Sequence, residues 1–285
     1  MYTVLNKKEL APDITRLEVK APLIAKKRKP GNFVIVRPSD KGERIPLTIV
    51  ESDEERGSIS LIVQAIGKST HLINNMQEGE TFADVVGPLG EPTPIRNFGT
   101  VVCVGGGVGT AVVYPMAVAL KEAGNRVISI IGAKSKELVI LENEMDAVSD
   151  ELMVTTDDGS YGLKGFVTEA LQNVLDRDDA INSVFTTGPL AMMRAVAEVT
   201  RQPEIQTYAS LNPIMMDGTG MCGACRVSVD SKLKFACVDG PEFDAHQINF
   251  DELISRNNTY VDQERQALEA YHHQQQCKAE GTYGH

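Results

Sequence analysis

At residues 98–110 the chain reads FGTVVCVGGGVGT, an apolar run that leads into a glycine-rich loop. The run Phe98–Val104 has the length and the apolar character of a buried strand, and the residues after the loop predict a helix that ends near Ala123. Glycines between a strand and a helix allow a tight turn and a close approach of the backbone to a ligand. The stretch therefore predicts the first strand–loop–helix unit of a parallel α/β domain.

The residues downstream repeat this alternation of strand and helix. Parallel strands joined by helices place their ligand-binding loops at the carboxyl ends of the strands. We therefore expect an α/β parallel-sheet nucleotide-binding domain over residues 97–208. Its other strands are expected at Arg126–Gly132, Leu152–Thr156, Ser183–Gly188 and Glu204–Ala209, and its other helices near Leu138–Ala147, Gly165–Leu175 and Pro189–Val199.

The loops of this domain carry only part of a dinucleotide signature. The third glycine of G-x-G-x-x-G would fall one residue later than Gly109, and the strand Arg126–Gly132 is not followed by an acidic residue. After the third strand, Thr155–Gly162 contains acidic and small residues that could hold a nicotinamide ribose or form a solvated turn. After the fourth strand, Gly188 would let a nicotinamide ring lie close to the backbone. The glycine loop could instead serve helix–strand packing alone.

The first 96 residues have a different pattern. Short β-rich segments alternate with turns that contain Pro, Gly and Asp. Six such segments at this spacing predict a small closed antiparallel β-barrel over residues 1–96, with one or two helical turns at Ser69–Met76. The expected strands are Val4–Leu10, Ile14–Lys20, Phe33–Arg37, Arg44–Glu51, Ser58–Gln64 and Thr81–Val86.

Two segments of the barrel could bind a flavin. Residues 44–48 read RIPLT, and strand alternation places the first, third and fifth of them on one face. There a cation could meet the pyrophosphate of a flavin while backbone groups and a hydroxyl meet its ring, although an ordinary edge strand could end in the same way. Residues 67–70 read GKST and open a helix whose free N–H groups suit a phosphate, or Ser69 could simply cap that helix.

A cysteine-rich segment is expected over residues 209–250. Residues 217–225 read DGTGMCGAC and Cys237 follows, which fits the C-x4-C-x2-C…C spacing of plant-type 2Fe–2S loops if Asp217 takes the first cysteine's position. The glycines would also free backbone N–H groups for bridging sulfides. A structural zinc site accepts the same ligand types but usually pairs two short cysteine knuckles, and an Asp before Gly is often a turn residue. The candidate cluster ligands are Asp217, Cys222, Cys225 and Cys237.

Composition excludes several classes of function. A formal net charge of −11 argues against nucleic-acid binding, because contacts to phosphates need a basic face. No stretch approaches the ~18 uninterrupted apolar residues of a membrane span, and the N-terminus lacks a basic region followed by an apolar one. We therefore expect a cytoplasmic protein that binds neither nucleic acid nor membrane. Over residues 251–285 we expect a polar helix at Asp251–Tyr271 and a disordered tail at His272–His285.

These motifs, in this order, resemble one family over residues 1 to about 250. Residues 44–48 (RIPLT), 87–90 (GPLG), 105–109 (GGGVG) and 188–189 (GP) are similar to the ferredoxin–NADP reductase superfamily. The cysteine segment resembles the branch that contains the electron-transfer subunit of dihydroorotate dehydrogenase. SLNPIMMDGTGMCGAC at 210–225 and FACVDGPEFD at 235–244 look most like the small subunits of NADH-dependent reduced ferredoxin:NADP oxidoreductase, also known as sulfide dehydrogenase subunits. The dihydroorotate branch has a cysteine where this chain has Asp217.

The resemblance implies a cofactor set and a partner. It implies FAD in the barrel, NAD(H) on the α/β half, and a 2Fe–2S cluster held by the four candidate ligands. It also implies a heterodimer with a larger subunit that carries a second FAD and 4Fe–4S clusters, and an assembly that couples NADH, NADPH and ferredoxin by flavin-based electron bifurcation. An electron-transfer subunit of a dihydroorotate- or sulfide-dehydrogenase-type complex is the alternative.

The resemblance also assigns residues to the two organic cofactors and none to catalysis, since the cofactors carry the chemistry. Carried over by position, the residues that would touch FAD are Arg44, Pro46, Leu47, Thr48, Gly67, Thr70 and Gly87. Those that would face the nicotinamide cofactor are Gly106, Gly107, Val108, Gly109, Asp157, Gly188 and Met192.

Overall fold

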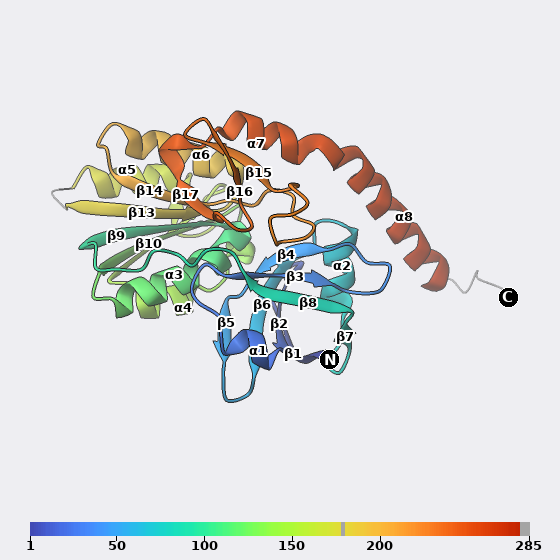
Figure 1. Ribbon diagram of the computed structural model, residues 1–285. Coiled ribbons are helices and arrows are strands. Elements are labelled where there is room, and N and C mark those ends of the chain that lie inside the picture. The colour runs from blue at the N-terminus through green and yellow to red at the C-terminus, as the bar shows by residue number, and fades with distance from the viewer. Residues whose placement is uncertain (178–179, 280–285) are drawn as a thin grey trace.

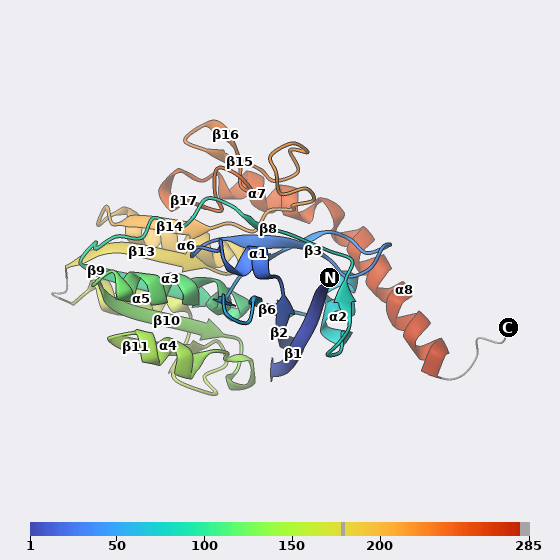
Figure 2. The same cartoon turned by 60° about the horizontal axis from the view of Figure 1, so that its bottom comes forward.

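The computed structural model describes residues 1–177 and 180–279, and Figures 1 and 2 show them from two directions. A barrel comes first along the chain, a parallel sheet with its helices lies beside it, and a cysteine-containing segment then returns over both (Figure 1). A long final helix, α8, projects from the body (Figures 1 and 2). The predicted fold class, an antiparallel barrel followed by a parallel α/β domain, is confirmed.

The barrel consists of two antiparallel sheets around one apolar core. One sheet has the order β5-β6-β2-β1-β7 and the other the order β4-β3-β8. The strands are β1 (Tyr2–Ala11), β2 (Ile14–Lys20), β3 (Phe33–Arg37), β4 (Ile45–Thr48), β5 (Glu51–Asp53), β6 (Ser58–Gln64), β7 (Thr81–Phe82) and β8 (Asp84–Leu89), with the short helices α1 (Pro22–Ala25) and α2 (Lys68–Asn75) between them.

Two predicted strands are each divided in the structure, because there the chain passes from one sheet to the other. The N–H of Ile49 donates to Asn32 O beside β3, whereas the N–H of the next residue, Val50, donates to Ser60 O on β6. The break between β7 and β8 has the same effect, because β7 pairs with β1 and β8 pairs with β3. Strands that switch sheets in this way close the barrel.

Strand β3 is the wall that the barrel shares with the cysteine segment. Its side chains alternate, so Val34 and Val36 lie in the barrel core while Phe33 and Ile35 lie in the core of the cysteine segment. A strand buried on both faces needs apolar residues at every position, which explains its FVIV sequence.

The second domain is a seven-stranded sheet of order β12-β11-β10-β9-β13-β14-β17, parallel except for β17. Apolar clusters lie on both faces of this sheet, and one of them also contains barrel residues such as Ile14 and Val50. The two domains therefore share buried surface. The elements are β9 (Thr100–Gly106), α3 (Thr110–Glu122), β10 (Arg126–Ala133), α4 (Glu142–Val148), β11 (Glu151–Thr156), β12 (Leu163–Lys164), α5 (Val167–Leu175), β13 (Ile181–Thr187), α6 (Leu190–Arg201) and β14 (Gln206–Ser210).

The cysteine segment has regular structure that the sequence did not predict. It contains the hairpin β15 (Arg226–Val229) and β16 (Lys232–Phe235), and then β17 (Glu242–Asp244), which pairs antiparallel with β14 at the edge of the large sheet. These strands have three or four residues each, too short for a periodic signal.

The C-terminal region is helical further than predicted. After α7 (Phe250–Asn257), α8 runs from Val261 to Ala279, so the disorder predicted from His272 is wrong over residues 272–279. Tyr271, the last residue of the predicted helix, is buried against the barrel, and its hydroxyl accepts a 2.9 Å hydrogen bond from Asn75 Nδ2 on α2. The next residue, His272, also contacts α2, since its ring lies 5.2 Å from the ring of His71. The rest of the predicted tail, residues 280–285, lies outside the described residues. Within residues 1–177 and 180–279, no helix is both long and apolar enough to cross a membrane.

Candidate functional site

The RIPLT segment forms the edge strand β4, paired with β3. Ile45 and Leu47 pack against the barrel core, so the side chains of Arg44, Pro46 and Thr48 face the other way, as alternation predicts. Any contact of Leu47 with a ligand on that outer face would have to use its backbone. The buried Nε of Arg44 has no hydrogen-bond partner in the described structure. A buried guanidinium nitrogen without an acceptor fits an anion such as a phosphate.

The start of α2 lies near this edge. The Thr70 hydroxyl accepts the N–H groups of Ile66 at 2.9 Å and Gly67 at 3.0 Å, whereas the Ser69 hydroxyl donates to Glu43, the residue before Arg44. The helix is therefore capped by Thr70 and not by Ser69. The space next to Gly67 is open, since a Cβ built there would meet no atom within 4 Å. Backbone N–H groups beside open space at a helix N-terminus suit a phosphate.

Gly87 has a packing role in β8, which pairs with β3 at the edge opposite β4. A Cβ built on Gly87 would lie 2.7 Å from Val34 Cγ1, so β8 approaches β3 more closely than any other residue would allow. This observation explains why a glycine is needed there without reference to a ligand.

The glycine loop after β9 is tightly packed against the end of β13. A Cβ on Gly109 would lie 2.4 Å from Thr187 O, and a Cβ on Gly106 would lie 2.3 Å from Met192 Sδ. Met192 also covers Gly188, so the structure brings together three of the predicted nicotinamide-site positions. Gly107 differs, because its φ is +56° and no atom lies within 4 Å of its Cβ position. The loop thus has a packed side and one open position at the beginning of α3.

Polar groups without partners mark the same region. The Oγ1 atoms of Thr186 and Thr187, at the carboxyl end of β13, are buried and have no hydrogen-bond partner among the described residues. Thr187 is directly before Gly188, where a nicotinamide ring is predicted. Unpaired buried hydroxyls at the ligand edge of a parallel sheet fit a polar ligand group such as a carboxamide.

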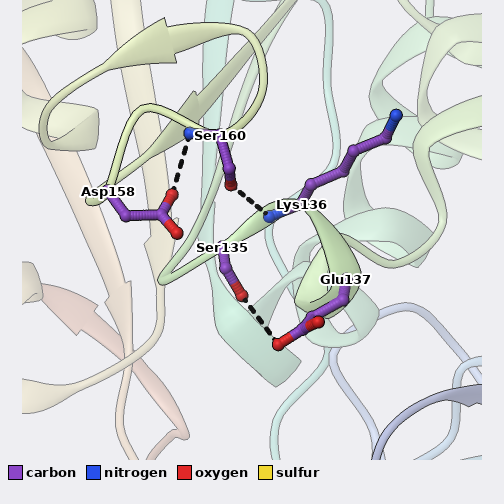
Figure 3. A pocket seen from close by; sticks show the side chains of 5 residues that line it. All are labelled: Ser135, Lys136, Glu137, Asp158 and Ser160. Carbon is purple, nitrogen blue, oxygen red and sulfur yellow. Dashed lines mark hydrogen bonds between the residues drawn. The ribbon is translucent and has the colours of Figure 1, made fainter.

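A cavity of about 510 Å³ lies beyond the carboxyl ends of β10 and β11 (Figure 3). The N–H of Lys136 donates to Ser160 Oγ at 2.8 Å, and the N–H of Ser160 donates to Asp158 at 2.9 Å. The first bond joins the two loops, and the hydrogen bonds that the Ser160 hydroxyl and N–H make with Asp158 lower the pKa of its carboxyl. The predicted residue Asp157 is exposed and is not among the lining residues, which are Ser135, Lys136, Glu137, Asp158 and Ser160.

The sequence analysis included Asp158 and Ser160 in the segment Thr155–Gly162 that could hold a ribose, but it missed Ser135, Lys136 and Glu137 because they are common turn residues. Their only signal was position, since they follow the predicted strand Arg126–Gly132, whose carboxyl end lies beside that of the next parallel strand.

The cysteine loop packs directly on the shared wall of the barrel. A Cβ on Gly218 would lie 2.6 Å from Leu89 Cδ1 and 2.9 Å from Ile35 Cγ1, and Gly218 has a φ of +80°. Gly220 and Gly223 also have positive φ values, of +80° and +66°. The turn therefore needs glycines for its left-handed backbone, and it places the residues around Asp217 next to β3 and β8.

Two of the four candidate ligands are in contact. Cys225 and Cys237 are buried with their Sγ atoms 3.2 Å apart, whereas Cys222 is exposed and the Asp217 carboxylate accepts a hydrogen bond from Thr219. Burial, the Cys225 thiol beside it and the nearby Cys222 raise the pKa of Cys237 to about 12, so this thiol is neutral without a cation. Iron would supply the charge that turns such thiols into thiolate ligands.

The structure does not bring all four candidate ligands together. Within residues 1–177 and 180–279, no group of three or more His, Cys, Asp or Glu side chains has an arrangement that could hold a metal ion. The chemistry of the donor set still fits a cluster, since three cysteines and an acid lie on one short loop and the hairpin behind it.

A barrel with an open anion-binding edge, a parallel sheet with a dinucleotide-type edge and a cysteine loop between them define a ferredoxin reductase-like electron-transfer protein. Phthalate dioxygenase reductase has the same fold at a TM-score of 0.61 and 18% identity, over 80% of this chain and 85% of that one. The family of iron–sulfur cluster binding domains of dihydroorotate dehydrogenase B matches residues 212–249.

The chain belongs to the family of dihydroorotate dehydrogenase B electron transfer subunits and their homologues. It is 44% identical over 268 residues to the electron transfer subunit homolog of Thermotoga maritima. The aligned residues make up 94% of each of the two chains. The electron transfer subunit of Bacillus cereus is 33% identical over 252 residues, which is 84% of this chain and 94% of that protein.

A solved structure is similar to nearly the same degree. The structure of NADH-dependent reduced ferredoxin-NADP oxidoreductase, which was studied for flavin-based electron bifurcation, aligns with a TM-score of 0.91 and 43% identity over 95% of this chain and 98% of that one. The predicted resemblance, the oxidoreductase class and the cofactor set of FAD, NAD(H) and a 2Fe–2S cluster are confirmed at the level of the family.

Proposed function

We propose that the chain is the small subunit of an electron-bifurcating NADH-dependent ferredoxin:NADP oxidoreductase, in which it passes electrons between NAD(H), FAD and a 2Fe–2S cluster to a larger subunit. The observation that carries this proposal is the position of the cysteine loop. Gly218 packs on Ile35 of β3, and β3 pairs with β4, the candidate flavin strand. A flavin on β4 and a cluster in the loop would therefore be neighbours across one strand.

The proposed division of the chain follows from these sites. Residues 1–96 would bind FAD, residues 97–208 would bind NAD(H), and residues 209–250 would hold the cluster. In the C-terminal part that begins at residue 251, α8 (Val261–Ala279) packs on the barrel through Tyr271.

Each cofactor has a proposed set of chain groups. Arg44 would neutralise the flavin pyrophosphate, the backbone N–H groups in the first turn of α2 would donate to its phosphate oxygens, and the outer face of residues 46–48 would meet the ring. The open position at Gly107 would receive the dinucleotide phosphates, and the Ser135–Ser160 cavity its ribose. Asp217, Cys222, Cys225 and Cys237 would bind the cluster, with Cys222 moving inward from its exposed position.

When bound, FAD converts the electron pair of a hydride into single electrons, and the cluster carries those one at a time. The chain would position the cofactors and keep water away from the path between them. Met192 packs on Gly106 and Gly188, the two positions where the nicotinamide is expected to lie close to the backbone. The apolar core shared by Phe33, Ile35, Cys225 and Cys237 excludes water from the path between the two redox sites.

We propose that the larger subunit, with its own FAD and 4Fe–4S clusters, docks over the cysteine loop. Exposed apolar side chains surround that loop, with Met216, Met221 and Val238 exposed by 58%, 88% and 43%. Large apolar residues gathered at one exposed site favour a protein interface. The names of the curated relatives support a second candidate, the electron transfer subunit of a dihydroorotate dehydrogenase. The partner that copurifies with the native chain decides between the two.

The test uses full-length protein isolated without oxygen. We expect bound FAD, two iron atoms and acid-labile sulfide per chain, and bleaching of the flavin by NADH. Arg44→Gln should weaken FAD binding by about 10- to 100-fold, because it removes a charge-assisted hydrogen bond. Arg37→Gln is the matched control, since Arg37 pairs with Asp84 on the barrel surface and should leave FAD affinity unchanged. Equal affinities in both variants would contradict the proposed flavin site.

A further inference from the structure

Two arginine side chains from different elements hold the turn 222–225, which begins and ends with a candidate cluster ligand. Arg226, the first residue of β15, donates from Nη1 to Gly223 O at 2.5 Å. Arg256, in the last turn of α7, donates from Nη2 to Ala224 O at 3.2 Å. These two carbonyl groups belong to the residues between the cysteines, so each accepts a hydrogen bond from a guanidinium, which is always positively charged.

The positive charge of these two arginines is not neutralised by a carboxylate. Ion pairs join several other arginines to acidic side chains, but over residues 1–177 and 180–279 none includes Arg226 or Arg256. The nearby acid Asp239 accepts the N–H of Phe235 at 2.7 Å and lies 3.8 Å from the Nζ atom of Lys234. Both arginines are half-buried, so solvent screens their charge less than it screens an exposed pair.

The other ends of the same two peptide groups are free. In a trans peptide the N–H points away from the C=O, so the N–H groups of Ala224 and Cys225 point away from the two guanidinium groups. Neither N–H donates to another group in the part of the chain that the structure describes. A cation bound to the carbonyl oxygen polarises the peptide and strengthens its N–H as a donor. These N–H groups therefore suit the anionic sulfur atoms of a cluster.

We propose that Arg226 and Arg256 are positioning residues that hold this turn around the cluster and raise the cluster's reduction potential. This inference rests on the proposed function. A cluster with three thiolates, one carboxylate and two sulfides is anionic before reduction, and it becomes more negative when it accepts one electron. A nearby positive charge therefore stabilises the reduced cluster more than the oxidised one. The electron comes from the flavin that NADH reduces, so no other reductant is needed.

The reduction potential of the cluster tests the role of the charge. The protein is the full chain, isolated without oxygen and loaded with FAD and cluster. Arg226→Gln and Arg256→Gln each retain a hydrogen-bond donor but remove the charge. Each should lower the equilibrium constant for reduction of the cluster about tenfold, a fall of about 59 mV for one electron. Anaerobic redox titration, with the reduced cluster followed by electron paramagnetic resonance, measures the change.

Two kinds of control separate charge from structure. Arg226→Lys and Arg256→Lys keep the charge, so their potentials should stay close to that of the wild type. Arg201→Gln is the matched control, because Arg201 also donates to a backbone carbonyl of the cysteine segment, that of His246 at 3.2 Å, but has no contact with the turn. Its potential should equal that of the wild type. A wild-type potential in both glutamine variants would overturn the role of the charge.

The holding role has its own readout. Arg256→Ala removes the hydrogen bond from α7 to the turn, so its cluster should lose iron to a chelator about tenfold faster than the wild-type cluster does. Equal rates of iron loss would overturn the holding role. The two arginines lie on separate elements, so each position tests the proposal independently of the other.

Failure of this inference differs from failure of the proposed function. A chain that takes up neither flavin nor iron would refute the proposed function, and the role of the arginines would fall with it. Glutamine variants with full iron content and an unchanged potential would refute the role of the arginines alone. The iron content of each variant is therefore measured before its potential.

Discussion

Two glycine-rich loops of this molecule have similar compositions but need their glycines for different reasons. In the loop at 105–109, Gly109 has an ordinary helical backbone and is required because a Cβ would lie 2.4 Å from Thr187 O. In the loop at 218–223, all three glycines have positive φ values between +66° and +80°. Gly109 needs only space, although Gly107 in the same loop has a φ of +56°, whereas every glycine of the second loop has a left-handed backbone. Packing therefore fixes the first loop at Gly109, and left-handed turns give the cysteine loop its shape.

The largest expected effect is the loss of the cluster at the cysteine loop without any loss of NADH binding at the other loop. Cys225→Ser and Cys237→Ser should each abolish the cluster, since serine does not replace a buried thiolate ligand. Iron and acid-labile sulfide should fall to near zero, while NADH binding at the other loop persists. Cys277→Ser, in α8, is the control and should retain full iron content. Retention of the cluster in either of the first two variants would exclude that cysteine as a ligand.

The next effect tests whether the first loop is fixed by packing. Gly109→Ala should lower the free energy of unfolding by about 3 kcal/mol, because the added methyl group meets a backbone carbonyl that cannot move away. Urea denaturation measures the change. Gly67→Ala is the matched control, since nothing lies within 4 Å of its Cβ position, and it should change stability by less than about 0.5 kcal/mol. Equal stabilities of the two variants would show that the loop relaxes and is not rigid.

A smaller effect separates stability from binding within the same loop. Gly107→Ala adds a methyl group to open space at a φ of +56°, so it should cost only about 1 kcal/mol of stability. If the open space receives the dinucleotide phosphates, NADH affinity should fall about tenfold or more, as measured by titration of flavin bleaching. Unchanged affinity would mean that Gly107 is only a turn residue.

The smallest effect concerns the carboxylate of the second loop. Asp217→Cys should keep the cluster but change its reduction potential and spectrum, because a thiolate donates more strongly to iron than a carboxylate does. Anaerobic redox titration measures both. An identical potential and spectrum would mean that Asp217 is not a ligand, and its hydrogen bond with Thr219 would then mark it as a turn residue.

The sequence predicted the regular parts of the fold well, because long periodic segments leave little choice. The apolar run before Gly105 and the alternation after it gave the parallel sheet and most of its helices. The outward face of Arg44, Pro46 and Thr48 followed from strand alternation alone. The tail was misread because its composition is polar, whereas in the structure Tyr271 and His272 both contact α2.

By itself the sequence determined which residue types could bind each cofactor, since spacing along the chain limits which side chains can converge on one ligand. Only the tertiary structure decided how the sites are related. It placed the cysteine loop on the face of β3 opposite the barrel core, and it placed Asp158 rather than Asp157 in the lining of the cavity beyond β10 and β11. These relations depend on contacts between residues far apart in the chain, and local propensity and periodicity carry no information about such contacts.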